Sequence, residues 1–370
     1  MLEQETSLNL NLNDSLYLSA EIMIGILTVC GNSLVLLTVY SSQNLHSTSN
    51  MFLCNLAAAD ICVGMFVAPS AMLTHYGIPS NYYGCVFLNC IVITFCDASI
   101  LMLLVIAADR FIAIRLPFEY QRVVSMNRVQ TVNITVWVVS IILGIFPMIG
   151  WRHPPKEIQF CSFKDVTKLE YMVYIQFFGV VLTSFTAMLV SNVYIFTVVR
   201  KHIQQIESIR DVLGLQPDQN FQRSYIRDLK TAKSLALMLV VFSHCWLPIG
   251  ILNTALLYCD GCSFSPSMIL MATSLSHANS FVNPLLYSTS NSSIRHAMWK
   301  LLFSDKDLET KQSSLEFISR MQTLHHNSAR IKSSHSLVQT TCTASLATER
   351  DSESKGYAEY NLGEVSTTIF

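Results

Sequence analysis

The stretch SLSHANSFVNPLLY, residues 274–287, decides the fold. It belongs to an apolar segment that is long enough to cross a bilayer, yet it contains a histidine, two asparagines, several serines and a proline. Its polar positions recur at the spacing of one helical face: Ser276, Asn279, Ser280, Asn283 and Tyr287. Polar groups that face hydrocarbon are costly, so this face should point into a helix bundle and line a binding site or a water channel. The alternative is a structural role, in which the same groups hydrogen-bond neighbouring helices.

The composition is that of a membrane protein. Hydrophobic residues make up 51% of the 370 residues and charged residues only 13%, whereas soluble domains average roughly 25% charged residues. The net charge of -1 does not bear on a nucleic-acid partner, but the sequence has no basic stripe interleaved with aromatic residues, which such a partner would favour. The eleven cysteines are scattered without the paired spacing of a zinc site.

Seven apolar segments reach the roughly 20 residues that a bilayer requires, so the sequence predicts an all-α membrane protein, a seven-transmembrane helix bundle. They lie near residues 17–40, 50–75, 85–112, 129–151, 170–199, 232–258 and 266–289. The connections after the third, fifth and seventh segments are rich in Lys and Arg. This places them in the cytoplasm and the N-terminus outside the plasma membrane. The loop before Tyr171 also carries basic residues on the outer side, which the rule does not predict.

The sequence divides the chain into four regions. Residues 1–16 are expected to form an extracellular tail with a glycosylation sequon at Asn13 and no cleavable signal peptide. Residues 17–290 form the transmembrane domain, and residues 291–304 a short amphipathic eighth helix on the inner membrane surface. Residues 305–370 are rich in Ser and Thr and predict a disordered cytoplasmic tail, whose C-terminus resembles a ligand of PDZ domains.

Ionisable and amide side chains inside the segments mark a candidate ion site. Asp60 lies mid-segment, where burial costs roughly 3 kcal/mol, so it should pair with other groups or hold a cation. The polar side chains expected around it are Asn32, Ser99, Asn279 and Asn283. Oxygen donors with one carboxylate suit a hard cation such as sodium. The alternative is an interhelical hydrogen-bond network without an ion.

Two segments carry groups that suit a conformational change. Asp109 and Arg110 close the third segment at the cytoplasmic edge, where they can pair with each other. Asp228 can also reach Arg110 from the start of the sixth segment, which would make a latch between two helices. The alternative is that these charges only anchor the helices at the membrane interface. Trp246 precedes Pro248 by two residues, so a helix kink lies beside a large ring.

Four cysteines fall at extracellular positions, where oxidation is expected. Cys85 and Cys161 can tie the third segment to the second outer loop. Cys259 and Cys262 are close enough in sequence for a small loop staple. The sequence alone does not fix this pairing.

Five motifs resemble the signature set of rhodopsin-like (class A) G-protein-coupled receptors. They are Gly31-Asn32, Leu56-Ala57-Ala58-Ala59-Asp60, Asp109-Arg110-Phe111, Cys245-Trp246-Leu247-Pro248 and Asn283-Pro284-Leu285-Leu286-Tyr287. Shorter stretches resemble adenosine receptors: SHANS at 276–280, TAKSL at 231–235, YMVY at 171–174 and IAIRLP at 112–117. The resemblance implies a receptor and not an enzyme, coupled to a heterotrimeric G protein that acts through adenylate cyclase. Arrestin is a further implied partner, and an allosteric sodium ion is the one cofactor considered.

The same resemblance implies a purine nucleoside site. The ligand contacts are Phe163, Asn253, Ser276, His277, Glu21, Val92 and Trp246. Phe163 would stack on the base, and Asn253 would grip the base edge, because an amide donates and accepts hydrogen bonds. Ser276 and His277 match the residues that meet the ribose hydroxyls, and Glu21 matches a carboxylate that orients the His277 ring.

Several positions depart from the pattern of adenosine receptors, and two others lack the residues that amine receptors and opsins need. Lys164 stands where an acidic residue is common, Gly250 where a His is common, and Asp97 where a Gln is common. The lost acidic and His contacts should weaken the binding of a purine nucleoside, or shift the preference to a relative such as inosine or to an anionic nucleotide that could use Lys164. Val92 occupies the position of the Asp of amine receptors, and His277 that of the Lys that opsins need for a retinal Schiff base.

Two other classes of protein share a bundle of apolar helices. A transporter would show an internal repeat with paired broken helices, which this sequence lacks. The other class is a receptor-shaped protein without a nucleoside ligand: an orphan class A receptor with a different small-molecule ligand, a constitutively active receptor or a scaffold. High basal activity or a lack of response to nucleosides would favour it.

Overall fold

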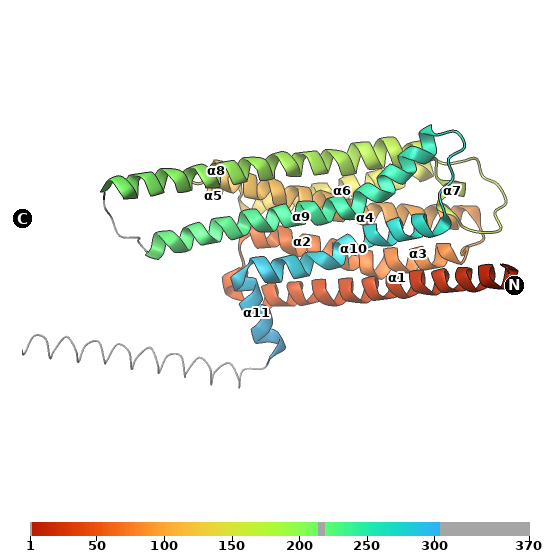
Figure 1. The fold of residues 1–370 in the computed structure, drawn as a ribbon, viewed down its shortest axis with the longest axis horizontal. Helices are drawn as coiled ribbons and strands as arrows, with labels where there is room; N and C mark the ends of the chain where they lie inside the picture. Colours follow the sequence, from red (N-terminus) through yellow and green to blue (C-terminus); the bar gives the residue numbers. More distant parts are fainter. Residues whose placement is uncertain (1, 214–218, 304–370) are drawn as a thin grey trace, which may run out of the picture. The chain divides into compact units, whose positions relative to one another are not determined.

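The computed structural model describes residues 2–213 and 219–303, apart from the side chains of 2–13, 202–203, 206–207, 209–213, 219–231 and 290. The elements are α1 (Leu2–Ser41), η1 (Gln43–Leu45), α2 (Thr48–Cys62), η2 (Val63–Val67), α3 (Ala68–His75), α4 (Tyr82–Arg115), α5 (Tyr120–Val123), α6 (Met126–Ile149), α7 (Phe163–Val166), η3 (Tyr171–Leu182), α8 (Thr183–Leu213), α9 (Gln219–Tyr258), α10 (Pro266–Ser290) and α11 (Ser292–Leu302). These helices all belong to one compact unit, Met1–Leu302, which Figure 1 shows as a bundle of roughly parallel and antiparallel rods.

Seven long helical stretches build the bundle within the described residues, which confirms the predicted architecture. Six are long and apolar enough to cross a membrane: Asp14–Ser41, Thr48–His75, Tyr82–Arg115, Met126–Ile149, Tyr171–Lys201 and Ala232–Tyr258. The seventh is α10, whose 25 residues include the polar stretch at 274–287. Two of the six contain a π-helical stretch, η2 in the second and η3 in the fifth. Because α4 packs against α2, α6 and α8, it runs through the middle of the bundle.

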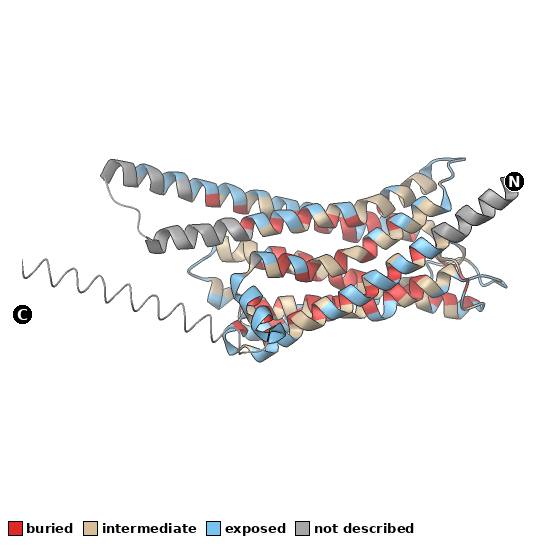
Figure 2. Cartoon of the chain, turned by 60° about the horizontal axis from the view of Figure 1, so that its bottom comes forward, coloured by how far each residue is buried: buried red, intermediate tan, exposed pale blue. Residues whose placement is uncertain are grey.

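The bundle exposes apolar side chains on its outer surface and buries several polar ones among its apolar core. Glu21 and Asp60 are fully buried, whereas Ile134 and Met271 on the outer surface are more than half exposed. Figure 2 shows how burial varies along the helices, with exposed residues on the outward faces and buried residues between neighbours. This arrangement suits a bilayer, where the lipid supplies the apolar surroundings and the polar groups must find partners inside the protein.

A neighbouring helix replaces the backbone hydrogen bond that the proline of the stretch 274–287 removes from α10. Pro284 has no N–H, so the carbonyl of Ser280, four residues earlier, loses its helical donor. The side-chain amide of Asn32 in α1 donates a hydrogen bond to this carbonyl at 3.1 Å. Gly31 allows the approach, because a Cβ there would lie only 3.1 Å from Pro284 Cγ. The Gly31-Asn32 motif therefore joins α1 to the break in α10.

The first helix extends beyond the first candidate span, which begins at Asp14. Helix α1 begins at Leu2, so the predicted tail of residues 1–16 is helical along its described length. The side chain of Asn13, the predicted glycosylation site, is not among the described side chains. The predicted tail from residue 305 onward also lies outside the described residues.

The short eighth helix is present as α11. Its Ile294 and Met298 are buried against Val39 and Leu45, while Leu302 remains exposed. Part of the apolar face of α11 thus packs on the bundle, and part of it is exposed.

Candidate ligand-binding site

A cavity of about 620 Å³ opens between the helices at the end of the bundle that carries α7. Its walls come from α1, α3, α4, α7, η3, α9 and α10. Six of the seven predicted ligand contacts line it: Phe163, Asn253, Ser276, His277, Val92 and Trp246. These residues are far apart in the sequence, and the fold brings them to one space of the size that small-molecule sites have.

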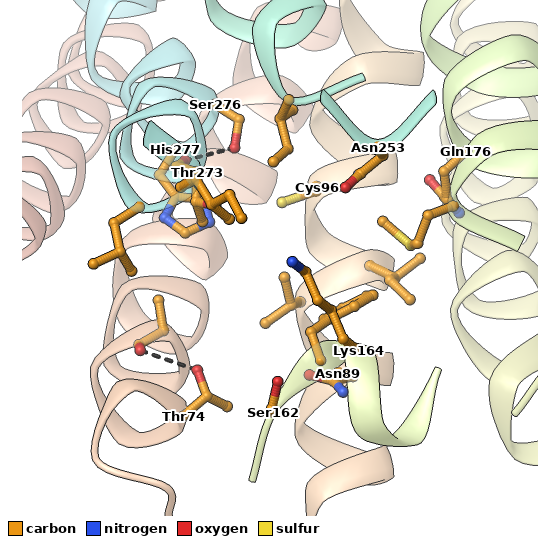
Figure 3. Close-up of a pocket in the computed structure, with 18 of the residues that line it drawn as sticks. Thr74, Asn89, Cys96, Ser162, Lys164, Gln176, Asn253, Thr273, Ser276 and His277 are labelled. Carbon is orange, nitrogen blue, oxygen red and sulfur yellow. Dashed lines mark hydrogen bonds between the residues drawn. The ribbon is translucent and has the colours of Figure 1, made fainter. Parts of the chain in front are cut away.

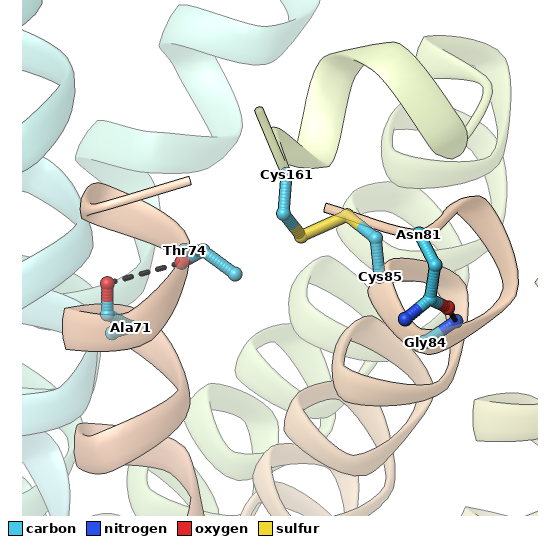
Figure 4. Close-up of a disulfide and its surroundings, with 6 residues drawn as sticks. All are labelled: Ala71, Thr74, Asn81, Gly84, Cys85 and Cys161. Carbon is cyan, nitrogen blue, oxygen red and sulfur yellow. Dashed lines mark hydrogen bonds between the residues drawn. A yellow bond between two sulfur atoms is a disulfide. The ribbon is translucent and has the colours of Figure 1, made fainter. Parts of the chain in front are cut away.

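A disulfide fixes one wall of this cavity. Cys85 at the start of α4 is joined to Cys161, with 5.4 Å between their Cα atoms, as Figure 4 shows. The backbone N–H of Cys161 also donates to the carbonyl of Gly77 at 3.0 Å. The next residues form the short helix α7, so Phe163 and Lys164 reach the cavity directly after the anchored cysteine. A second disulfide joins Cys259 to Cys262 in the turn after α9.

The predicted partner of His277 is in place. The His277 Nδ1 atom lies 3.0 Å from Glu21 Oε2, and both side chains are almost fully buried. Glu21 does not line the cavity itself but holds the ring that does. The hydroxyl of Ser274 donates a second hydrogen bond to Glu21 Oε1 at 2.7 Å. Sequence analysis missed Ser274, which lies one helical turn before His277 and so shares its face.

The polar groups of the cavity come from two sides. In Figure 3, Asn253 and Gln176 lie on one side and Ser276 and His277 on the other, with Lys164 extending from α7 between them. Ser276 donates its hydroxyl proton to the carbonyl of Thr273 at 2.6 Å, which leaves its oxygen lone pairs as acceptors.

Gly250, which stands where adenosine receptors commonly have a His, leaves room for the ring of Phe177. A Cβ on Gly250 would lie 2.8 Å from Phe177 Cγ and closer still to two other atoms of that ring. The ring of Phe177 thus occupies the space beside α9 that a side chain at residue 250 would need.

Asp97 lies deep in the same cavity and is 1% exposed. Gln176 in η3 donates to its Oδ2 at 3.1 Å, and the same amide nitrogen also donates to the Tyr171 hydroxyl at 2.8 Å. Sequence analysis noted Asp97 but did not find Gln176, because the pairing depends on how η3 packs against α4.

Asp60 is hydrogen-bonded by side chains of α4 and α10, among them Ser280, Ser99 and Asn283. Ser99 donates to Asp60 Oδ1 at 2.6 Å, and Asn283 donates to Oδ2 at 2.8 Å. Asn32 bonds instead to backbone carbonyls, and the Asn279 amide nitrogen has no partner among the described residues. Ser99 and Asn283 thus bond Asp60 directly, and a role of Asn32 and Asn279 in an ion site stays a prediction. A set of carboxylate, hydroxyl and amide oxygen atoms fits a sodium ion chemically.

At the other end of α4, Arg110 pairs with its neighbour. Its guanidinium donates to Asp109 Oδ2 at 2.8 Å. The hydroxyls of Ser49 and Tyr120 donate to the same carboxylate at 3.0 and 2.7 Å. Burial raises the pKa of the Tyr120 hydroxyl, which keeps it protonated as a donor. The side chain of Asp228 lies outside the described ones, so the latch across to α9 stays a prediction.

The groups expected to move lie in the helix interiors. Pro248 and Pro284 are inside α9 and α10. Trp246 lines the cavity, and its ring lies near that of Phe242, with 6.5 Å between their centroids. Tyr287 is 3% exposed and belongs to the main hydrophobic core. Trp246, Phe242 and Tyr287 thus belong to one continuous apolar cluster that begins at the cavity.

Comparisons with known proteins agree with this fold and site. The family model described as "7 transmembrane receptor (rhodopsin family)" matches residues 31–287. The human adenosine receptor A2a is 35% identical over 307 residues, covering 79% of this chain and 73% of the relative. The human adenosine receptor A2b is 33% identical over 312 residues (79% and 91%), and the sheep (Ovis aries) adenosine receptor A3 is 36% identical over 278 residues (74% and 84%). The chain therefore belongs to the rhodopsin family of G-protein-coupled receptors and, within it, to the adenosine receptor family. Proteins of this family are multi-pass membrane receptors and not enzymes.

Proposed function

We propose that this chain is a plasma-membrane receptor for adenosine or a closely related purine nucleoside, with its N-terminus outside the cell. One observation carries the proposal: Phe163, Asn253, Ser276 and His277 line a single cavity, and Glu21 holds the His277 ring from behind. The aromatic face of Phe163 and the amide of Asn253 match a flat base. The ring nitrogen of His277 and the hydroxyl of Ser276 match the sugar joined to it.

The two sides of the cavity would bind different parts of the nucleoside. Phe163 would stack on the purine, and Asn253 would donate to and accept from the base edge. Ser276 and His277 would meet the ribose hydroxyls. The short distance between His277 and Glu21, 3.0 Å, supports this role, because a ring fixed by a carboxylate needs less ordering when the ligand binds.

Binding would act on the G protein through α9 and α10. A nucleoside that bridges Asn253 and His277 links the two helices and contacts Trp246, which lies two residues before Pro248. A swing of α9 at this proline would open the cytoplasmic end near Arg110 for a G-protein helix. The ligand achieves this only through a higher affinity for the open state. A sodium ion at Asp60 would favour the closed state.

A second ligand class has its own supporting observation. Lys164 lines the cavity and forms no ion pair within the described residues, so its ammonium group is available to an anionic ligand. Adenine nucleotides are therefore the alternative to adenosine and inosine.

The test is the change in cyclic AMP in cells that express the chain, titrated with adenosine, inosine and adenine nucleotides. We expect a saturable response to a nucleoside that Asn253→Ala weakens by tenfold or more, roughly the loss of one well-placed hydrogen bond. The matched control is Asn127→Ala, since Asn127 is exposed at the start of α6 and lies outside the cavity. Arg110→Ala should keep ligand binding and lose signalling.

A flat response in this assay, and in reporters for the other G-protein families, would refute the nucleoside assignment. A response shared equally by wild type and Asn253→Ala would refute the binding mode.

A further inference from the structure

The floor of the cavity contains a buried carboxylate oxygen that no described residue satisfies. Asp97 is 1% exposed, yet its Oδ1 atom has no hydrogen-bond partner among the described residues. Its other oxygen, Oδ2, accepts from Gln176. A buried acceptor without a donor is costly, and a buried charge is costlier still, so the unpaired oxygen calls for a partner.

The neighbours of Asp97 cannot easily supply that partner. The Gln176 amide nitrogen has two hydrogens, and it already donates to both Asp97 and the Tyr171 hydroxyl. The Tyr171 hydroxyl in turn donates to the carbonyl of Leu143 at 2.6 Å. Each donor of this small network is therefore in use. No Lys, Arg or His forms an ion pair with Asp97 within the described part of the chain.

Asp97 is the innermost of the α4 residues that line the cavity. The α4 residues that line the cavity begin at Asn89 and end at Asp97, eight positions or about 12 Å along the helix. Cys96, next to Asp97, packs in the cluster that contains Trp246. Apolar side chains, including Phe177, surround this level of the cavity, and in such surroundings a hydrogen bond to a charged group is strong.

We propose that Asp97 is a specificity-determining residue, whose Oδ1 accepts a hydrogen bond from an N–H group at the inner end of the ligand, preferentially a protonated amine. This inference rests on the proposed function and deepens it. If Phe163 and Asn253 hold the base and His277 the ribose, then the exocyclic 5′ end of the sugar is the part that extends away from the base. The favoured ligand class is thus a purine nucleoside with a cationic nitrogen at the 5′ position.

The experiment compares three probes in the cyclic AMP assay: adenosine, 5′-amino-5′-deoxyadenosine and 5′-deoxyadenosine. In the wild type we expect the amine to be about tenfold or more as potent as adenosine, and 5′-deoxyadenosine to be the weakest. Asp97→Asn keeps the shape of the side chain and removes its charge. We expect it to bring the ratio of amine to adenosine potency close to one, while adenosine potency changes by less than about threefold.

Asp260→Asn serves as the control, because Asp260 is an exposed acid on the loop between α9 and α10, outside the cavity lining. It should leave the wild-type ratio unchanged at equal surface expression. If Asp97→Asn does not reach the cell surface, Asp97→Gln and the wild-type ranking of the three probes decide the question.

The outcomes separate the two claims. If adenosine activates the receptor but the amine has no advantage, or if the advantage survives in Asp97→Asn, this inference is overturned and the proposed function stands. If no nucleoside elicits a response, the proposed function fails and this inference fails with it.

Discussion

Replacing Gly250 by Ala should destabilise the receptor, because the ring of Phe177 fills the space that a methyl group would need. The new Cβ would lie 2.8 Å from Phe177 Cγ and nearer still to Cδ2 and Cε2, whereas carbon atoms pack at about 3.5–4.0 Å. The ring must therefore move by an ångström or more, and it is 9% exposed and part of the main hydrophobic core. Overpacking of this kind typically costs about 1–3 kcal/mol.

The assay is thermal unfolding of the purified, ligand-free receptor, followed with a thiol-reactive dye that reports exposure of the buried Cys96 and Cys245. Because 1 kcal/mol shifts the midpoint of a domain of about 200 residues by roughly 2–4 °C, we expect a fall of several degrees for Gly250→Ala. The control is Gly179→Ala, whose Cβ would meet only the Tyr174 carbonyl oxygen at 3.4 Å, an ordinary contact.

A double-mutant cycle isolates the clash. In a Phe177→Ala background, which has its own cavity cost, Gly250→Ala should become neutral or slightly stabilising, since Ala is favoured over Gly in a helix by about 1 kcal/mol. A Gly250→Ala midpoint equal to that of the wild type, or an equal loss in both backgrounds, would refute the steric argument.

Three further predictions concern single contacts. Replacing Glu21 by Gln removes the charge that holds His277. Because a hydrogen bond to a charged group is worth about 1.5–3 kcal/mol, nucleoside affinity in a competition assay should fall by about ten- to a hundredfold. Unchanged affinity would contradict the proposed role of Glu21. Replacing Asp60 by Asn should abolish the difference in agonist affinity expected between sodium chloride and choline chloride, and a sodium effect that persists would rule out this ion site. Replacing Cys85 by Ser breaks the disulfide to Cys161 and frees the loop that forms one wall of the cavity. Binding should then weaken by about tenfold or more at equal surface expression, and an intact affinity would show that the loop holds its place without the disulfide.

The bundle and most of the cavity could be predicted from the sequence, because hydropathy and motif spacing are local signals. Seven apolar segments defined the helices, and a polar stripe on one face of the last segment indicated the interior. Resemblance to adenosine receptors then named residues such as Asn253 and His277, which the fold brings to one cavity.

What the sequence did not predict depends on how helices pack against each other. The bond between Gln176 and Asp97 joins residues 79 positions apart, and no periodicity reveals it. Ser274 was missed as a partner of Glu21 for the same reason. The bond from the Asn32 amide to the carbonyl left open by Pro284 was not predicted either, because this need appears only once α1 lies beside α10.

The three partners of Asp109 make the Arg110 ion pair inexpensive to separate. Removing the only partner of a buried charge costs about 3–5 kcal/mol. If Arg110 leaves, however, the hydroxyls of Ser49 and Tyr120 still donate to the Asp109 carboxylate, which is 4% exposed. The Arg110 side chain is itself 32% exposed and can exchange the carboxylate for water. The pair is therefore a reversible contact with a small free-energy difference between its closed and open forms, so a modest preference of a ligand or a G protein for the open form suffices to shift the population.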